Sequence, residues 1–260
     1  MTPPRSEALL RVVAADLHLS QEGLSDSFAV LRDVMGAGRY WTEYEPVIEP
    51  RSVTVVGYEA LARFRKPDGS PVPASSMFAL LHADPALLAR VELELKRHQI
   101  ENRPADTELF VNLDPDSWFH SKPADAGELL GLLKRGGRTV VEVIENMDAA
   151  DALVGRDLVT TLKARGLSVA LDDLGATNGL FSFEALEQAD VFKFERSFLR
   201  RLGDRRKAIV QAFVRMAHET GARTVMEGVE TEADLDLAVA LEMDLVQGHL
   251  FRDRSVVVGR

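Results

Sequence analysis

Charged and amide side chains stand at the ends of the apolar runs in this sequence. Residues 169–173 read VALDD, so three apolar residues lead directly into Asp172 and Asp173. A buried strand has no need of such groups, because burying an unpaired charge is costly. The residues that occupy these run ends are Glu59, Asn112, Glu142, Asp172 with Asp173, Lys193, Glu227 and Gln247. We interpret them as the candidate functional residues.

Five of these residues are carboxylates and one is a lysine. A single lysine cannot neutralise five acids, whereas divalent cations can. Oxygen ligands without Cys or His favour hard ions such as Mg²⁺ or Mn²⁺, and the six histidines show no metal-ligand spacing. A pair of ions ~3.5–4 Å apart suits phosphodiester hydrolysis. The residue types therefore predict a two-ion hydrolytic site.

Each of these residues also has a structural explanation when it is taken alone. Asp172 and Asp173 are typical of a turn or a helix N-cap, and Glu59 is typical of an ion pair with Arg63. Lys193 is compatible with an edge strand from which its side chain reaches solvent. Recurrence at one strand end after another is what favours the functional interpretation.

The elements that must position these residues alternate between short apolar runs and longer amphipathic stretches. Near-continuous apolar strands separated by helices predict a parallel sheet, and eight strands predict a closed α/β (β/α)₈ TIM-like barrel of ~250 residues. The carboxyl ends of its strands would then meet at one face. The expected strands are 44–48, 53–61, 109–113, 139–145, 167–173, 191–195, 223–230 and 245–251, and the expected helices are 85–101, 124–135, 149–165, 197–220 and 232–242.

Residues 1–39 read differently from residues 40–260, which we assign to the barrel domain. Two short stretches with helical spacing, ALLRVVAADL and SFAVLRDVM, predict a short N-terminal helical extension that ends near Gly36 and Gly38. This extension is expected either to pack over the barrel or at a dimer contact, or to dock a protein partner.

Composition excludes several classes of function. A formal net charge of −10 argues against coating duplex nucleic acid, which requires Lys and Arg to neutralise phosphates. The absence of Cys suits a reducing compartment. No apolar run approaches ~18 residues and the N-terminus does not resemble a signal peptide, so we expect no membrane insertion and a cytoplasmic protein.

The chain from about Tyr40 to Phe251 resembles the EAL-domain cyclic di-GMP phosphodiesterases. The motif that names the family stands at residues 59–63 as EALAR, and the other motifs follow in the family's order. They are VNL around Asn112, VEVIE around Glu142 and Glu145, DDLG from Asp172, FKFE around Lys193, EGVET from Glu227 and QG from Gln247.

The resemblance implies a barrel that hydrolyses cyclic di-GMP to linear pGpG with two Mg²⁺ or Mn²⁺ ions. One ion would be held by Glu59, Asn112, Glu142 and Asp172, and the second by Asp172, Asp173 and Glu227. Lys193 and Glu227 would be the catalytic residues, acting on the water or on the developing phosphate charge. Leu61, Arg63, Glu230 and Gln247 would contact the ligand, Glu145 would anchor the loop after Asp173, and the protein would form a homodimer.

Several positions depart from the family pattern. Leu174 replaces an aromatic residue, residues 176–180 replace a Gly-Tyr-Ser segment, and Glu45 stands in place of a glutamine. These departures leave an alternative: a catalytically weak or inactive cyclic di-GMP receptor, or a protein-interaction module. A third hypothesis, a Schiff-base enzyme that uses Lys193, requires a lowered lysine pKa, which the surrounding carboxylates oppose.

Overall fold

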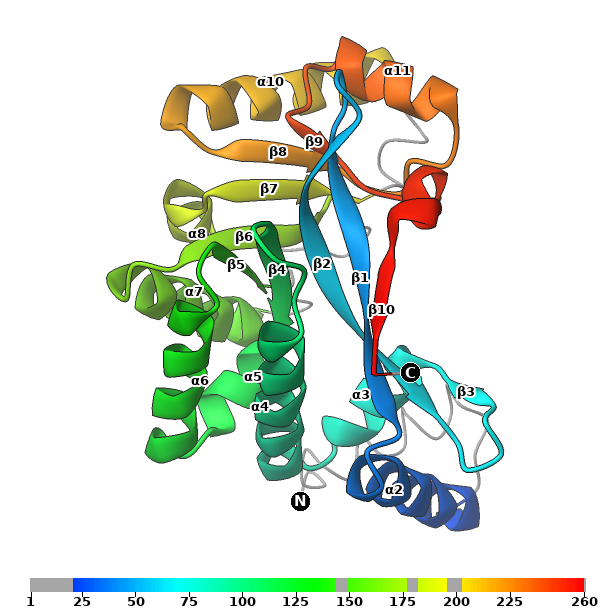
Figure 1. The fold of residues 1–260 in the computed structure, drawn as a ribbon. Coiled ribbons are helices and arrows are strands. Elements are labelled where there is room, and N and C mark those ends of the chain that lie inside the picture. The colour runs from blue at the N-terminus through cyan, green and yellow to red at the C-terminus, as the bar shows by residue number, and fades with distance from the viewer. Residues whose placement is uncertain (1–20, 144–148, 177–181, 196–202, 260) are drawn as a thin grey trace.

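A computed structural model describes residues 21–143, 149–176, 182–195 and 203–259 (Figure 1). The strands are β1 (Tyr40–Glu49), β2 (Thr54–Arg65), β3 (Pro71–Val72), β4 (Glu108–Leu113), β5 (Thr139–Val143), β6 (Ser168–Leu174), β7 (Val191–Phe194), β8 (Arg223–Met226), β9 (Leu245–Val246) and β10 (Val256–Val258). The helices are α2 (Gln21–Gly36), α3 (Ala74–Leu81), α4 (Pro85–Glu101), α5 (Pro115–His120), α6 (Pro123–Arg135), α7 (Ala149–Ala164), α8 (Phe183–Gln188), α10 (Asp204–Thr220) and α11 (Glu232–Ala240), with a 3₁₀ helix η1 (His249–Arg254).

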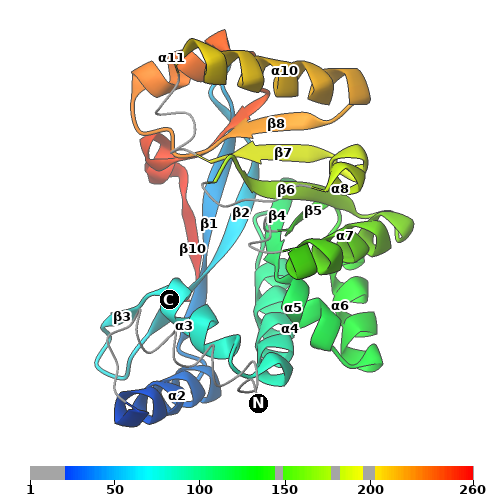
Figure 2. The same ribbon diagram turned by 180° about the vertical axis from the view of Figure 1, so that it is seen from behind.

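The strands close into the predicted α/β barrel. Strands β2 and β4 to β9 pair in parallel in chain order, and β1 joins the two ends of this row by pairing with both β2 and β9. Figures 1 and 2 show helices such as α4, α6, α7, α10 and α11 on the outside of this sheet, while α2 and α3 lie near the far ends of β1 and β2. Eight strands therefore make the ring in the described part of the chain, as the sequence predicted.

One strand runs in the opposite direction from the prediction of an all-parallel sheet. Strand β1 is antiparallel to both of its neighbours in the ring. Only residues 50–53 separate β1 from β2, and so short a connection makes a hairpin, because a parallel pair needs a crossover of a dozen or more residues. Strand β10 then pairs antiparallel with β1 outside the ring.

The interior of the barrel is filled by one layer of apolar side chains from successive strands. Seven strands each contribute one buried residue, and Val56 of β2 completes the layer in a partly buried position. The buried residues are Val47, Phe110, Val140, Ala170, Val191, Val225 and Leu245. This layer makes the barrel a packed core, so any site has to lie at one of its two ends.

Helix α2 covers the second helical stretch that the sequence predicted in residues 1–39, and the first stretch lies outside the described residues. Leu31 and Val34 of α2 are buried in a separate apolar cluster with Phe64, Met77 and Leu88. The division at residues 39 and 40 stays a prediction. No helix in the described segments is long and apolar enough to cross a membrane.

The last two predicted strands are shorter than expected. Strand β8 ends at Met226, and β9 covers only Leu245–Val246 before the chain turns into η1. The turn is made at Gly248, whose φ of +152° suits glycine, and which lies against the backbone of Val229. Glu227 and Gln247 therefore sit just beyond the strand ends rather than within strands.

Candidate active site

Lys193 on β7 lies at the centre of a cluster of carboxylates at the carboxyl ends of the barrel strands. Its ammonium Nζ is 2.6 Å from Oε1 of Glu142 and 2.8 Å from Oε1 of Glu227. Oδ1 of Asp172 lies at 3.2 Å and Oε2 of Glu59 at 3.4 Å. The lysine side chain is only 2% exposed, so these four acids surround a buried cation. Residues from five strand ends therefore meet as the sequence predicted.

The two amide side chains of the predicted set both bind Glu59. Nδ2 of Asn112 donates a hydrogen bond of 2.7 Å to Oε1 of Glu59, and Nε2 of Gln247 donates one of 2.7 Å to Oε2. Strand pairing explains the first contact, since β2 and β4 are parallel neighbours. The Glu59 carboxylate is thereby held at both oxygens, by one amide from β4 and by one from the chain just after β9, the strands that flank the β1–β2 pair.

An irregularity in β6 brings both adjacent acids toward the cluster. Successive side chains of a regular strand point to opposite faces. The pairing of β6 with β7 shifts register between Leu171 and Leu174, and Asp173 adopts a left-handed φ of +55°. As a result Asp172, Asp173 and Glu227 each place one carboxylate oxygen within 4.8 Å of the others.

Burial and neighbouring charges shift the pKa values of Lys193 and Glu59 in opposite directions. Burial alone would lower the pKa of Lys193, but Asp172, Glu142, Glu227 and Glu59 together raise it well above its usual value. A lysine held in its charged form is a poor Schiff-base nucleophile, which disfavours the third hypothesis. Although burial would raise the pKa of Glu59, Lys193 and the two amides lower it.

Three other carboxyls of the cluster hold their protons more tightly than usual. Burial, followed by the charge of Glu59, raises the pKa of Glu142 well above its ordinary value. Burial raises the pKa of Glu227 to about 8 despite the nearby Lys193, and burial with the charge of Asp172 raises that of Asp173 to about 6. The cluster therefore carries more acid than one lysine can stabilise.

The residues present fit divalent cations. Oε2 of Glu142 is buried without a hydrogen-bond partner among the described residues. The side chains of Asp172, Asp173 and Glu227 converge within reach of a single ion. The oxygen donors of these groups are those that Mg²⁺, Mn²⁺ and Ca²⁺ accept. Cations would satisfy the orphaned oxygen and offset the mutual repulsion of the acids.

The residues expected to contact a ligand lie in different surroundings. Leu61 and Arg63 line a cavity of about 260 Å³ that also includes Asn112, the residue that binds Glu59, although the five carboxylates of the cluster are not among its lining residues. Arg63 forms an ion pair with Glu43 and not with Glu59, which corrects the structural explanation of Glu59. Glu230 is exposed beyond β8. The predicted loop anchor, Glu145, lies outside the described residues.

Two groups of residues near the site were not predicted from the sequence. Glu45 of β1 stands opposite Glu59 in the β1–β2 pair, and burial followed by the charge of Glu59 raises its pKa. His82, Asp114 and Asp116 form a second cluster, in which Nε2 of His82 is 2.9 Å from Oδ2 of Asp114. Spacing along the sequence could not predict this cluster, because His82 and Asp114 belong to different elements of the chain.

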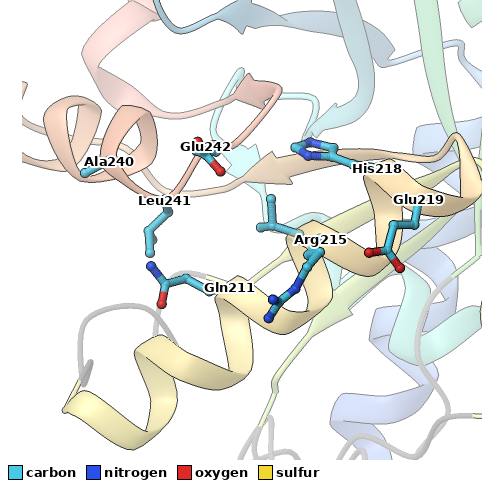
Figure 3. Close-up of a pocket in the computed structure, with 8 residues that line it drawn as sticks. Gln211, Arg215, His218, Glu219, Ala240, Leu241 and Glu242 are labelled. Atoms are coloured by element: carbon cyan, nitrogen blue, oxygen red, sulfur yellow. The ribbon is translucent and has the colours of Figure 1, made fainter.

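A larger cavity of about 700 Å³ lies away from the carboxylate cluster (Figure 3). It is formed by one side of α10 and the chain that follows α11, with Arg215, His218 and Glu242 among its lining residues. His218 also binds Asp244, which in turn accepts a hydrogen bond from the backbone of Thr224 at the start of β8. This cavity is therefore at the opposite end of the barrel strands.

Comparison with known proteins gives consistent matches over this part of the chain. A sequence model of the EAL domain matches residues 29–253. The chain is 24% identical over 235 residues to the probable cyclic di-GMP phosphodiesterase PdeN of Escherichia coli, covering 84% of this chain and 44% of PdeN. It is 24% identical over 230 residues to the bifunctional diguanylate cyclase/cyclic di-GMP phosphodiesterase MucR of Pseudomonas aeruginosa, covering 85% of this chain and 34% of MucR. The chain thus spans less than half the length of these relatives.

Solved structures agree with the fold. The phosphodiesterase of MucR, in complex with cyclic di-GMP, matches with a TM-score of 0.74 and 23% identity, covering 86% of this chain and 95% of that one. A manganese and cyclic di-GMP complex of BlrP1 from Klebsiella pneumoniae matches with a TM-score of 0.70 and 27% identity, covering 85% of this chain and 57% of that one. With the family model covering most of its length, this chain belongs to the EAL domain family.

Proposed function

We propose that this chain is a metal-dependent phosphodiesterase that hydrolyses cyclic di-GMP to linear pGpG. The observation that carries the proposal is that the carboxylates of four residues converge on one buried ammonium group, that of Lys193. The four residues are Glu59, Glu142, Asp172 and Glu227. Such a concentration of acid destabilises the fold unless cations offset it. Membership of the EAL domain family supports the proposal, because its relatives PdeN and MucR are described as a probable and a bifunctional cyclic di-GMP phosphodiesterase.

The proposal assigns the acidic groups to two Mg²⁺ or Mn²⁺ ions. Glu59, Asn112, Glu142 and Asp172 would hold one ion, while Asp172, Asp173 and Glu227 would hold the other. Divalent ions bound there would acidify a water molecule and neutralise charge on a phosphate. Manganese and calcium complexes of BlrP1 with cyclic di-GMP support a divalent requirement in a relative that is 27% identical.

Two residues of the chain are suited to move or hold protons. Lys193 keeps its proton because four carboxylates surround it, so it can donate a hydrogen bond to an attacking oxygen or to a phosphate oxygen that gains charge. Burial raises the pKa of Glu227, which borders the same space, to about 8 in the metal-free protein, so its carboxyl holds a proton near neutral pH. Once ionised beside bound cations, its carboxylate would be placed to accept a proton from an attacking water. Both roles were predicted from the sequence.

A hydrolysis assay tests the proposal. The purified chain is incubated with cyclic di-GMP and Mg²⁺ or Mn²⁺, and pGpG is measured by chromatography. Glu59→Ala removes a carboxylate that three other side chains bind, so activity should fall by about 100-fold or more. Glu128→Ala, on the outer face of α6, is the matched control and should retain activity. Absence of pGpG from folded wild-type protein would exclude the enzyme.

The alternative, a receptor or interaction module with little turnover, is favoured by one observation. Leu174 replaces the family's aromatic residue, and its side chain is buried beside the acidic pair. Calorimetric binding of cyclic di-GMP without pGpG in any divalent metal would support this alternative. The homodimer, the cytoplasmic location and a partner-docking role for residues 1–39 remain predictions that belong to either form of the proposal.

A further inference from the structure

Arg63 on β2, one of the residues expected to contact ligand, is already engaged by an acid of this chain. Its guanidinium Nε donates a hydrogen bond of 2.7 Å to Oε2 of Glu43 on β1. In the antiparallel β1–β2 pair, Glu43 stands opposite Leu61. Arg63 is therefore its diagonal neighbour, which long side chains reach. The ion pair follows directly from the hairpin register.

A second acid on the same strand adds to the charge around Arg63. Glu45 lies two residues after Glu43 and so projects from the same face of β1. It stands opposite Glu59, and its pKa is raised by burial first and then by the charge of Glu59, while the charge of Arg63 opposes this rise. Arg63 therefore forms an ion pair with Glu43 while the charge of a second acid of β1, Glu45, lies nearby.

The location of Arg63 makes this pairing relevant to a ligand. Arg63 lines the cavity of about 260 Å³ that also borders Leu61 and Asn112. Asn112 also binds Glu59, so this one side chain connects the cavity with the carboxylate cluster. The side chains of Arg63 and Glu43 are 34% and 36% exposed, so solvent and an anionic ligand can both reach the pair. A phosphate that approaches Arg63 therefore meets the Glu43 carboxylate.

We infer that Glu43 sets the affinity of the site for its phosphate-bearing ligand by competing with that phosphate for Arg63. The inference rests on the proposed function, because it takes cyclic di-GMP as the ligand. Glu43 would not contact the reacting atoms. It acts through Arg63, and its negative charge weakens binding without taking part in the chemical step.

The variant Glu43→Gln separates charge from geometry. Glutamine keeps an oxygen that accepts from Nε of Arg63, but it carries no charge. Because a partly exposed ion pair is worth little, KM for cyclic di-GMP and its calorimetric Kd should both fall by only about two- to fivefold, with kcat unchanged. The effect should shrink at high salt, where exposed charges are screened.

Two further variants make the result specific. Glu128→Gln removes a charge from another partly exposed Glu–Arg pair, with Arg97, and should leave KM unchanged. In an Arg63→Ala background, Glu43→Gln should lose most of its effect, because the residue through which it acts is gone.

The outcomes distinguish this inference from the proposed function. Wild-type protein that neither binds nor hydrolyses cyclic di-GMP would overturn both. If the wild type is active but Glu43→Gln leaves KM unchanged or raises it, only the inference fails. A raised KM would mean that the charge of Glu43 positions Arg63 for the ligand instead of competing with it. If Glu43→Gln lowers KM equally in the wild type and in the Arg63→Ala background, Glu43 does not act through Arg63, and the inference fails as well.

Discussion

At the scale of single residues, Lys193 acts as the resident cation of a cluster that is otherwise acidic. It is 2% exposed and within 3.4 Å of four carboxylates. Removing one partner of a buried ion pair is far more costly than replacing the whole pair, because the remaining charges are left uncompensated. The stability of the metal-free protein should therefore depend on this one side chain.

The variant Lys193→Met tests that dependence, since methionine has a similar volume and no charge. In EDTA, the free energy of unfolding should fall by about 3–5 kcal/mol, measured by urea denaturation. Lys163→Met is the matched control: its pair with Asp190 is partly exposed, so the loss should stay below about 1 kcal/mol. Divalent cations should restore part of the loss only in Lys193→Met. Equal losses in the two variants would show that Lys193 does not hold the acids together.

The sequence was sufficient to identify the residues at the centre of this cluster. Each follows an apolar run, and the barrel brings run ends together, so Glu59 and Lys193 meet although 134 residues separate them. The ion pair of Glu43 with Arg63 was not predicted. The contact between Glu43 and Arg63 depends on β1 running antiparallel to β2. The alternation of strands and helices in the sequence does not indicate the direction of a strand.

At the scale of elements, the direction of β1 and the irregularity in β6 are the features that pattern reasoning missed. Periodicity indicates where a strand lies but not which way it runs, so the hairpin of β1 with β2 was hidden by the parallel pattern of the other strands. The register shift in β6 depends on the left-handed Asp173, which apolar spacing cannot predict. Both features decide which acids face the site.

The turn after β9, which Gly248 makes, is a third feature that the sequence pattern did not predict. The backbone of Val229 donates to Gln247 and accepts from Leu250, so the two chain segments are in direct contact around Gly248. A Cβ at residue 248 would lie 2.3 Å from the carbonyl oxygen of Val229. This close approach holds Gln247 where its amide reaches Glu59.

Gly248→Ala should therefore destabilise the protein by about 2–5 kcal/mol, through strain at a positive φ and through the clash with Val229. Gly127→Ala in α6 is the control, because a Cβ there meets nothing within 4 Å. In a helix interior that change should stabilise the protein by about 0.5–1 kcal/mol. Thermal unfolding of both variants gives the comparison, and a neutral Gly248→Ala would contradict the role assigned to the turn.

At the scale of the whole molecule, the net charge of −10 and the buried acids together link folding to protons and cations. Glu227 has an ordinary pKa of 4.5 when unfolded and about 8 in the folded protein, and that of Asp173 rises from 3.8 to about 6. Between these values the folded state holds protons that the unfolded state has released. Stability therefore decreases as pH rises through this window. The lowered pKa of Glu59 acts in the opposite direction but only at more acidic pH.

We expect the metal-free protein to lose stability, on the order of a few kcal/mol, between about pH 4.5 and about pH 8. Divalent cations bind the ionised carboxylates, so the stabilisation by Mg²⁺ should grow over the same range. Urea unfolding in EDTA and in Mg²⁺ at several pH values measures both trends. Glu227→Gln should flatten the EDTA curve, because it removes a carboxyl whose pKa rises from 4.5 to about 8 on folding. If the stability of the wild type in EDTA stays constant or rises with pH, these acids are ionised in the folded protein throughout the range. The cluster would then need cations at every pH and not only above neutrality.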